Sequence, residues 1–266
     1  MKLGFSARPS NDLAGLNALY ASFSTRVPTD NIQKRIWFAG TRREPLTGGD
    51  PAEFYENWLR YGTGGTCWPI NGGWCSLLET VGFEARRIVS SVIIDGYPAG
   101  ANHGSVIVTL DGRDYLVDAW MAAFEALPLV SDRATSGGTG LHTITAIPMN
   151  GDFEIRMFSG HDRDRILPVR TELGCSAVNH EYFLARYDLT KEIGFFNHAL
   201  YICRRFPDHI IVLGRQNKIV VDASNSVTKT GVTETERRRV LVEELGIAEA
   251  IAAALPPDVI GAPALL

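Results

Sequence analysis

Several features that assign a chain to a special class are scarce in this sequence of 266 residues. It has only 4 cysteines, too few for a disulfide scaffold at this size, so we expect reduced thiols. It has no apolar run long enough to span a bilayer and no apolar secretory leader, which favours a cytoplasmic protein. Its 26 basic and 30 acidic residues give a formal charge of −4, which argues against electrostatic binding to nucleic acid or an anionic membrane.

Motifs for common bound groups are also missing. Cys67 and Cys75 lack a matching second pair of Cys or His, so we predict no metal site. The sequence contains no glycine-rich loop of the kind that ends in Gly-Lys-Ser/Thr and binds nucleotide phosphates. The composition, with 45% apolar and 21% charged residues, is that of an ordinary globular protein with a sizeable core.

The hydrophobic periodicity divides the chain into three parts. Residues 1–85 have helical spacing and predict a helical subdomain, and residues 86–190 are rich in β-branched residues and predict a β-barrel or sandwich subdomain. Residues 191–266 combine strands with a helix and predict a mixed α/β segment that could form a lid. The expected fold class is therefore α+β.

Helix boundaries are marked by capping residues. One helix is predicted over 13–23, where apolar residues recur every three or four positions, and a second between an Asp50 cap and a closing Gly62. A third is predicted from Trp74 to Gly82, after a glycine-rich loop over 62–73. A capping box at Thr233 opens a further helix that ends at Gly246. The expected strands are Ile88–Ile94, Ser105–Leu110, Asp114–Trp120, Thr143–Ile147, Ala199–Arg205, Ile210–Leu213 and Lys218–Asp222.

A hairpin places two ionisable residues together. Asp111-Gly112 is a strong two-residue turn signal, and with these residues at its centre His103 faces Trp120 and Ser105 faces Asp118. Because side chains alternate along a strand, all four project from one face. His103 and Asp118 are then diagonal neighbours, about 7 Å apart at the backbone, which predicts a contact between their side chains.

A nucleophile for this pair is found in the glycine-rich segment. Cys67 lies close to the start of the third predicted helix, where the helix dipole and a nearby imidazolium would both favour a thiolate. We therefore predict a catalytic triad of Cys67, His103 and Asp118. Each residue also has a structural interpretation. Cys67 could be a small buried thiol, His103 a structural histidine at the start of a strand, and Asp118 a carboxylate paired with Ser105.

Two segments resemble the arylamine N-acetyltransferase family: GTGGTCWPINGGWCSLLETVGFEARRI at 62–88 and NHGSVIVTLDGRDYLVDAW at 102–120. VPTDNI at 27–32 and RRFPDHIIVL at 204–213 are similar to further family segments. The resemblance implies ping-pong transfer of an acetyl group from acetyl-CoA, as co-substrate, through Cys67 to an arylamine or hydrazine. It implies that His103 is the general base, that Asp118 orients it, and that a small-molecule amine and acyl-CoA are the partners.

The sequence departs from the family near the nucleophile. Thr63 replaces the arginine of the family's Arg-Gly-Gly-x-Cys loop, Pro69 replaces a glutamate, and Asp30 replaces another glutamate. The family's Val-Gly-Phe-Gly after the aspartate is here Ala-Trp-Met-Ala at 119–122. These changes affect the expected donor and acceptor more than the triad, and they suggest an amide synthase that uses a longer acyl thioester as an alternative.

Three large side chains near the predicted triad suit a water-excluding pocket for an aromatic acceptor: Trp68, Trp120 and Met121. Each is also a typical core residue. The order Cys, His, Asp is shared with hydrolases and transglutaminase-like enzymes, and a catalytically silent binding protein of the same fold is a further alternative.

Overall fold

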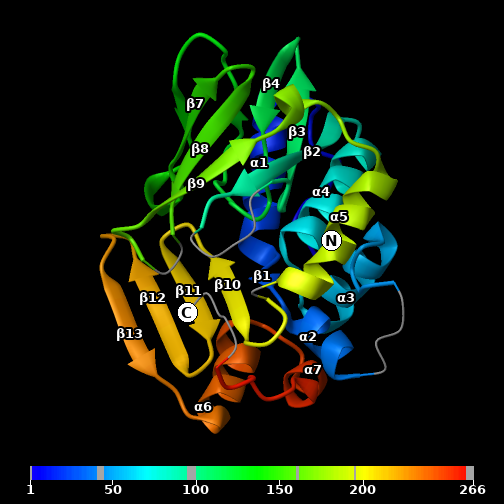
Figure 1. The fold of residues 1–266 in the computed structure, drawn as a ribbon. Coiled ribbons are helices and arrows are strands. Elements are labelled where there is room, and N and C mark those ends of the chain that lie inside the picture. The colour runs from blue at the N-terminus through cyan, green and yellow to red at the C-terminus, as the bar shows by residue number, and fades with distance from the viewer. Residues whose placement is uncertain (1, 41–44, 95–99, 160–161, 195, 262–266) are drawn as a thin grey trace.

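The computed structural model describes residues 2–40, 45–94, 100–159, 162–194 and 196–261. Its helices are α1 (Leu13–Arg26), α2 (Ile32–Ala39), α3 (Pro51–Tyr61), α4 (Cys67–Thr80), α5 (His180–Ile193), α6 (Glu234–Arg239) and α7 (Glu249–Ala254), with a π-helical turn at Val240–Glu244 after α6. Short 3-10 turns lie at Gly140–His142 and Leu173–Cys175. Helices α2 to α5 gather on one side of the molecule, beside two sheets (Figure 1).

The strands form two antiparallel sheets. The eight-stranded sheet has the order β5-β4-β3-β2-β9-β8-β7-β6, and the five-stranded sheet has the order β1-β10-β11-β12-β13. The strands of the first sheet are β2 (Glu84–Val92), β3 (His103–Leu110), β4 (Arg113–Leu116), β5 (Leu127–Pro128), β6 (Thr135–Gly137), β7 (Ile144–Met149), β8 (Asp152–Phe158) and β9 (Ile166–Thr171). Those of the second are β1 (Thr29–Asp30), β10 (Tyr201–Arg205), β11 (His209–Gly214), β12 (Asn217–Asp222) and β13 (Val227–Gly231).

The first two predicted helices are present, and the predicted Asp50 cap and closing Gly62 of the second are confirmed. The Asp12 carboxylate accepts a hydrogen bond from the Gly15 amide at the start of α1. The Asp50 carboxylate accepts from two amides at the start of α3, and Gly62 ends that helix with φ of 77°, in the left-handed region that favours glycine. The Thr233 capping box is also present.

The third helix begins earlier than predicted. Helix α4 starts at Cys67, so Gly72 and Gly73 lie inside the helix and not in a loop. A β-carbon on Gly73 would lie 2.4 Å from the Phe54 ring, and one on Gly72 would lie 3.6 Å from the Phe183 ring. Gly73 therefore lets α3 pack closely on α4, whereas a β-carbon on Gly72 would make only an ordinary contact with α5. The tertiary contact at Gly73 overrides its weak helix propensity.

The eight-stranded sheet curls until its two edge strands meet. Thr135 at the start of β6 donates a side-chain hydrogen bond to the carbonyl of Pro128 in β5. A β-carbon on Gly137 would lie 3.2 Å from the α-carbon of Leu127. The sheet is therefore barrel-like and nearly closed, as expected for the second part of the chain.

The five-stranded sheet has an apolar cluster on each face. One face packs on residues of α2, α7 and the π-helical turn, including Ile32, Ala252 and Leu241. The other face carries Tyr201 and Cys203 and meets Leu141, which lies in the 3-10 turn between β6 and β7. Strand β1 extends this sheet at β10, so two residues from the N-terminal part complete a C-terminal sheet.

The overall architecture confirms the α+β fold class, with helices followed by a barrel-like sheet and a mixed C-terminal segment. The sequence did not predict α5, which begins at an Asn179 cap and lies against α4 (Figure 1). None of the helices in the described part of the chain is both long and apolar enough to cross a membrane.

Candidate active site

The structure places Cys67 at the first position of α4. The backbone of Thr66 is the cap, with extended geometry and no side-chain hydrogen bond to the helix. The amides of the first helical residues point out of the helix end, where they carry partial positive charge. Cys67 is 9% exposed, so it is nearly enclosed by protein.

His103 and Asp118 are in contact as predicted, but the expected strand over Asp114–Trp120 ends at Leu116, so Asp118 lies in the segment that follows β4. Strands β3 and β4 pair with Ile107 opposite Leu116, and the turn residues Asp111 and Gly112 have φ of 48° and 72°. The His103 Nε2 atom lies 2.7 Å from Asp118 Oδ2. This leaves Nδ1 free of Asp118, and the interaction with Cys67 is one of the causes that raise the pKa of His103.

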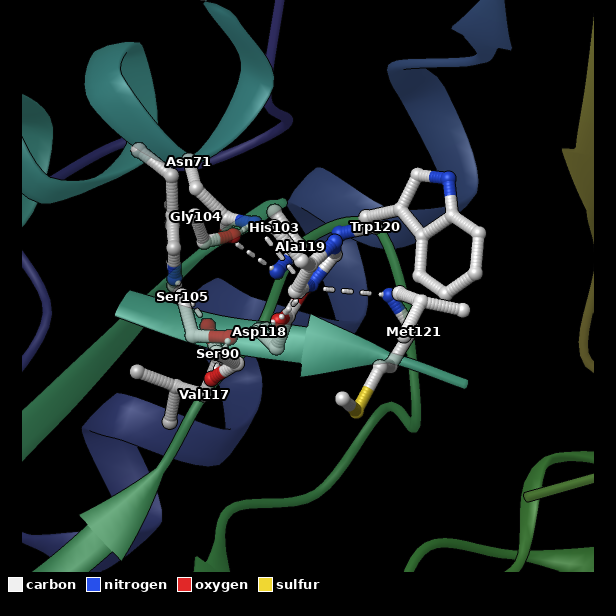
Figure 2. Close-up of polar contacts among 12 residues, drawn as sticks. Asn71, Ser90, His103, Gly104, Ser105, Val117, Asp118, Ala119, Trp120 and Met121 are labelled. Carbon is white, nitrogen blue, oxygen red and sulfur yellow. Dashed lines mark hydrogen bonds and ion pairs between the residues drawn. The ribbon is translucent and has the colours of Figure 1, made fainter. Parts of the chain in front are cut away.

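The Asp118 carboxylate lies at the centre of a dense hydrogen-bond cluster, shown in Figure 2. Its Oδ2 atom accepts from the Ser105 hydroxyl at 2.6 Å in addition to His103. Its Oδ1 atom accepts from the Asn71 amide at 2.9 Å and from the backbone amides of Trp120 and Met121 at 2.9 and 3.2 Å. The five donors hold both oxygens in place within the protein interior.

These contacts shift the pKa values of the buried pair in opposite directions. Burial opposes the charged form of His103, but the charge of Asp118 and the interaction with Cys67 outweigh it and raise the pKa of His103. Burial likewise opposes ionisation of Asp118, but His103 and the hydrogen-bond donors lower the pKa of this carboxyl. The arrangement favours an imidazolium beside a carboxylate.

Asn71 and Tyr20 support this cluster, and sequence reasoning did not single them out. Asn71 lies four residues after Cys67 on the same face of α4, and its side chain joins Gly104, Asp118 and Ala119 by three hydrogen bonds. The Tyr20 hydroxyl donates to the Asp118 carbonyl at 2.6 Å. A signal for Asn71 was present, since a buried asparagine inside a helix is unfavourable unless its amide is used.

The three predicted pocket residues lie in different surroundings. Trp120 is 8% exposed, and its ring meets the His103 ring edge to face at a centroid distance of 4.9 Å. Met121 lines a cavity between the two sheets. Trp68 is 1% exposed and packs against Phe183 at 4.7 Å, as a core residue does.

Asp30 braces the segment before the nucleophile. Its carboxylate accepts hydrogen bonds from the amide of Gly64 at 2.6 Å and from that of Ile32 at 2.9 Å. Gly64 packs so tightly that a β-carbon would lie 1.8 Å from the Pro28 carbonyl oxygen. Thr63, which replaces the family's loop arginine, is fully buried and contacts Gln33. Two backbone amides thus hold the Asp30 carboxylate in place, without the arginine that the family has at the position of Thr63.

Lys34 is a further buried charge near Cys67 that the sequence did not predict. Its ammonium group donates to the Thr190 hydroxyl at 2.7 Å and lies over the Tyr187 ring at 5.8 Å. Burial lowers the pKa of Lys34 to about 7, and its interaction with Cys67 opposes this shift.

Comparisons with known proteins agree with this arrangement. A family model described as N-acetyltransferase matches residues 12–253. An arylamine N-acetyltransferase of Mycolicibacterium smegmatis is 28% identical over 123 residues, which are 44% of this chain and 42% of that protein. The aligned part therefore spans less than half the length of this curated relative.

Among the described residues, no group of three or more His, Cys, Asp or Glu side chains is arranged to hold a metal ion.

Solved structures show the same fold. The M. smegmatis arylamine N-acetyltransferase aligns with a TM-score of 0.77 at 19% identity, over 95% of this chain and 94% of that one. The Salmonella typhimurium enzyme aligns with a TM-score of 0.79 at 16% identity, over 95% and 94%. A Bacillus cereus enzyme, described as having a unique Cys-His-Glu catalytic triad, aligns with a TM-score of 0.74 at 15% identity, over 93% and 96%. Because the family model spans most of the sequence, the chain belongs to the arylamine N-acetyltransferase family.

Proposed function

We propose that the protein transfers an acetyl group from acetyl-CoA to an arylamine or hydrazine through a thioester on Cys67. The observation that carries this proposal is the 2.7 Å contact of His103 with Asp118, together with the position of Cys67 at the N-terminus of α4, where it interacts with His103. A thiol beside an imidazole that a carboxylate orients is the constellation of nucleophilic acyl transfer.

The reaction proceeds in two half-reactions that share one base. His103 takes the thiol proton, the Cys67 sulfur attacks the thioester carbonyl, and the coenzyme A thiolate leaves and takes up that proton. The amine then attacks the acyl-cysteine, gives its proton to His103 and displaces the Cys67 sulfur, which regains a proton. Asp118 keeps the imidazole oriented in both steps, because its Oδ2 atom holds Nε2 at 2.7 Å.

Two backbone amides at the helix end supply positive charge where the carbonyl oxygen becomes negative. The amides of Cys67 and Trp68 are the first two of α4, and the third residue, Pro69, has no N–H. Within the described residues, neither amide has a hydrogen-bond partner. We therefore assign the oxyanion hole to Cys67 and Trp68.

The enclosure of the site protects the acyl-enzyme from water. Cys67, His103 and Asp118 are 9%, 1% and 1% exposed. We assign Trp120 and Met121 to the acceptor pocket, because Trp120 contacts the imidazole and Met121 lines the adjoining cavity. Trp68 supports this pocket from the core. Excluding water matters because hydrolysis of the thioester would compete with transfer to a weak nucleophile.

We keep the division into residues 1–85, 86–190 and 191–266 as a functional proposal. In it the first part supplies the nucleophile, the second supplies His103 and Asp118, and the third closes the cleft. We also propose a cytoplasmic location, since the reaction needs a reduced thiol and a supply of acetyl-CoA.

Intact-mass measurement tests the proposal. On mixing with acetyl-CoA, the protein should gain one acetyl group, and an added arylamine should remove it. The variant Cys67→Ala should gain none, whereas Cys75→Ala should still gain one, because Cys75 is a buried thiol away from His103. Acetylation of the Cys67→Ala variant at the same rate as the native protein would exclude this mechanism.

An amide synthase acting on a longer acyl thioester is the second candidate. The observation that favours it is Trp120, which occupies a position where the family has glycine and forms an apolar wall against His103. The same mass measurement separates the two candidates. An adduct with a longer acyl-CoA but none with acetyl-CoA would support the synthase.

A further inference from the structure

The backbone pairing between β2 and β3 stops at His103. The register of the two strands runs from Glu84 opposite Thr109 to Ser90 opposite His103. Strand β2 continues beyond Ser90 to Val92, and there its other edge still pairs with β9. His103 is therefore the last residue of β3 that the backbone ladder holds, and the end of a ladder is where strands fray.

The Asn102 side chain continues this pairing where the backbone stops. Its Oδ1 atom accepts a hydrogen bond from the Val92 amide at 2.8 Å, and its Nδ2 atom donates to the Val92 carbonyl at 3.0 Å. A side-chain amide has the donor and the acceptor of a peptide group, so Val92 receives the pair of hydrogen bonds that a backbone partner would exchange with it. Asn102 thus supplies one more ladder pair through its side chain.

Side chains also hold the residue before Asn102. The Ala101 amide donates to Glu172 Oε2 at 3.2 Å. The Ala101 carbonyl accepts from two nitrogens of Arg186, and the Nε atom is 2.8 Å away. Glu172 follows β9, and Arg186 belongs to α5. The chain that leads into β3 is therefore anchored to β2, to the end of β9 and to α5 by three side chains.

The other side of His103 is held without such side chains. Gly104 pairs with Val89 through the backbone, and the pairing continues along β3. A β-carbon on Gly104 would lie 2.4 Å from the Phe183 ring, so this residue is also closely packed. The position of His103 therefore depends on backbone pairing on one side and on the Asn102 side chain on the other.

The imidazole of His103 has little tolerance for movement. The residue is 1% exposed, and its Nε2 atom lies 2.7 Å from Asp118. In the proposed function its other ring nitrogen serves Cys67. Misplacement of a catalytic group by about 1 Å can cost about 10²-fold in rate. An anchor directly before His103 controls the backbone from which the ring projects.

We propose that Asn102 is a positioning residue for His103, because its side-chain pair with Val92 fixes the direction in which the imidazole leaves β3. The effect on acetyl transfer rests on the proposed function, whereas the effect on the ring does not. The alternative is that Asn102 only stabilises the ends of β2 and β3. Removal of the side chain would displace the imidazole in the first case and leave it in place in the second.

Single-turnover acetylation of Cys67 at saturating acetyl-CoA, followed by intact mass, is the first test. We expect Asn102→Ala to slow this step about 10- to 100-fold and to leave the half-saturating concentration of acetyl-CoA within about threefold of native. Asn17→Ala is the matched control, because Asn17 also bonds to the backbone, at the Ala126 amide. Its rate should stay within twofold of native. A rate within twofold of native in Asn102→Ala would overturn the proposal.

The ring nitrogens of His103 give a test that needs no acyl donor. In protein with ¹⁵N-labelled histidine, the His103 signals are assigned by their loss in His103→Gln. We expect Asn102→Ala to shift or broaden these signals and to leave those of the other histidines unchanged. Unchanged His103 signals would overturn the proposal. If the native protein does not acetylate Cys67 but its His103 signals respond to Asn102→Ala, only the proposed function is refuted.

A second variant and thermal unfolding separate positioning from stability. Arg186→Met removes the hold on the Ala101 carbonyl from a half-buried position of α5 and retains an apolar stem. Because this hold lies one residue further from His103, we expect a smaller loss, about 3- to 10-fold in the acetylation rate. A lower melting temperature for Asn102→Ala, with rates within twofold of native in both variants, would establish a structural role and overturn the proposal. If Asn102→Ala does not fold, a native rate in Arg186→Met overturns it alone.

Discussion

Asp118 and Asp30 are two fully buried carboxylates with opposite pKa shifts. Asp118 has five hydrogen-bond donors, one of them His103, and its pKa is lowered despite burial. Among the described residues, Asp30 has two backbone donors and no cationic partner, and burial raises its pKa to about 7. Both residues are 1% exposed, so the extent of burial does not explain the difference.

The comparison shows that partners decide the charge of a buried acid. Asp118 is built to remain ionised and to orient His103, which suits the proposed general base. The Asp30 side chain accepts a hydrogen bond from the Gly64 amide, but no cation among the described residues balances its charge when it is ionised. Aspartate thus orients the proposed catalytic base at position 118 and holds the segment before Cys67 in place at position 30. The following predictions test this distinction.

The largest effect is expected from Asp118→Asn. The asparagine NH2 would face Nε2 of His103 as a donor, so the ring would carry its proton on Nδ1 and could not accept one from Cys67. We expect acylation of Cys67 by acetyl-CoA to slow by about three to four orders of magnitude. Single-turnover mass measurement gives this rate. Ser105→Ala, which removes one donor but no charge, is the control, and a loss of less than tenfold in Asp118→Asn would contradict the assigned role.

Asn71→Ala should weaken the hydrogen-bond cluster around Asp118. The change leaves the Gly104 carbonyl and the Ala119 amide without partners inside the protein, and it removes one donor from the carboxylate. We expect the free energy of unfolding to fall by about 2–4 kcal/mol. Urea titration measures this loss. A matched change at Asn17, which makes one hydrogen bond to the Ala126 amide, should cost less.

Asp30→Asn should change how stability depends on pH. In the native protein the folded state holds the Asp30 proton up to about pH 7, whereas the unfolded chain releases it near the ordinary value of 3.8. The folded state therefore binds more protons between these limits, and its stability falls as pH rises through this window, by up to about 1.4 kcal/mol per unit. Asp30→Asn removes this contribution, so the difference in stability between the two proteins should vary across the window. Parallel stability curves from urea titrations at pH 4–7 would show that Asp30 does not titrate as described.

The smallest effect is expected at Ala122. This residue has φ of 49°, in the left-handed region, and it belongs to the turn that directs the Trp120 and Met121 amides at Asp118. Ala122→Gly should raise the free energy of unfolding by about 0.5–1 kcal/mol, because glycine adopts this backbone without strain. Ala123→Gly, at a neighbouring position without positive φ, should lower it. Equal effects of the two changes would contradict the strain.

The hairpin was predictable because its information is local. Asp111-Gly112 fixes the turn type, the turn fixes the register, and the register brings His103 to Asp118. Helix α1 and the capping box at Thr233 were predictable for the same reason, since capping residues act within one turn.

The start of α4 depended on contacts distant in sequence. Gly72 and Gly73 have weak helix propensity, and the close packing of Phe54 on Gly73 is visible only in the folded chain. Helix α5 carried a usable signal, because its buried Phe183, Tyr187 and Thr190 recur at three- and four-residue spacing behind Asn179.

The burial of Lys34 was not predictable from sequence, since it results from Thr190 and Tyr187, which lie on α5. Charges of this kind become visible only when the chain is folded.

Strand β1 connects the segment before Cys67 to β10 in the C-terminal part of the chain. Asp30 pairs through its backbone with Ile202 of β10, while its side chain holds the amide of Gly64. The reactive cysteine therefore depends on an anchor built from residues made long after it during synthesis. A ribosome-bound chain that ends before β10 has the complete sequence of the segment around Cys67 but lacks this anchor, so we expect Cys67 to become reactive only after Tyr201–Arg205 has been translated.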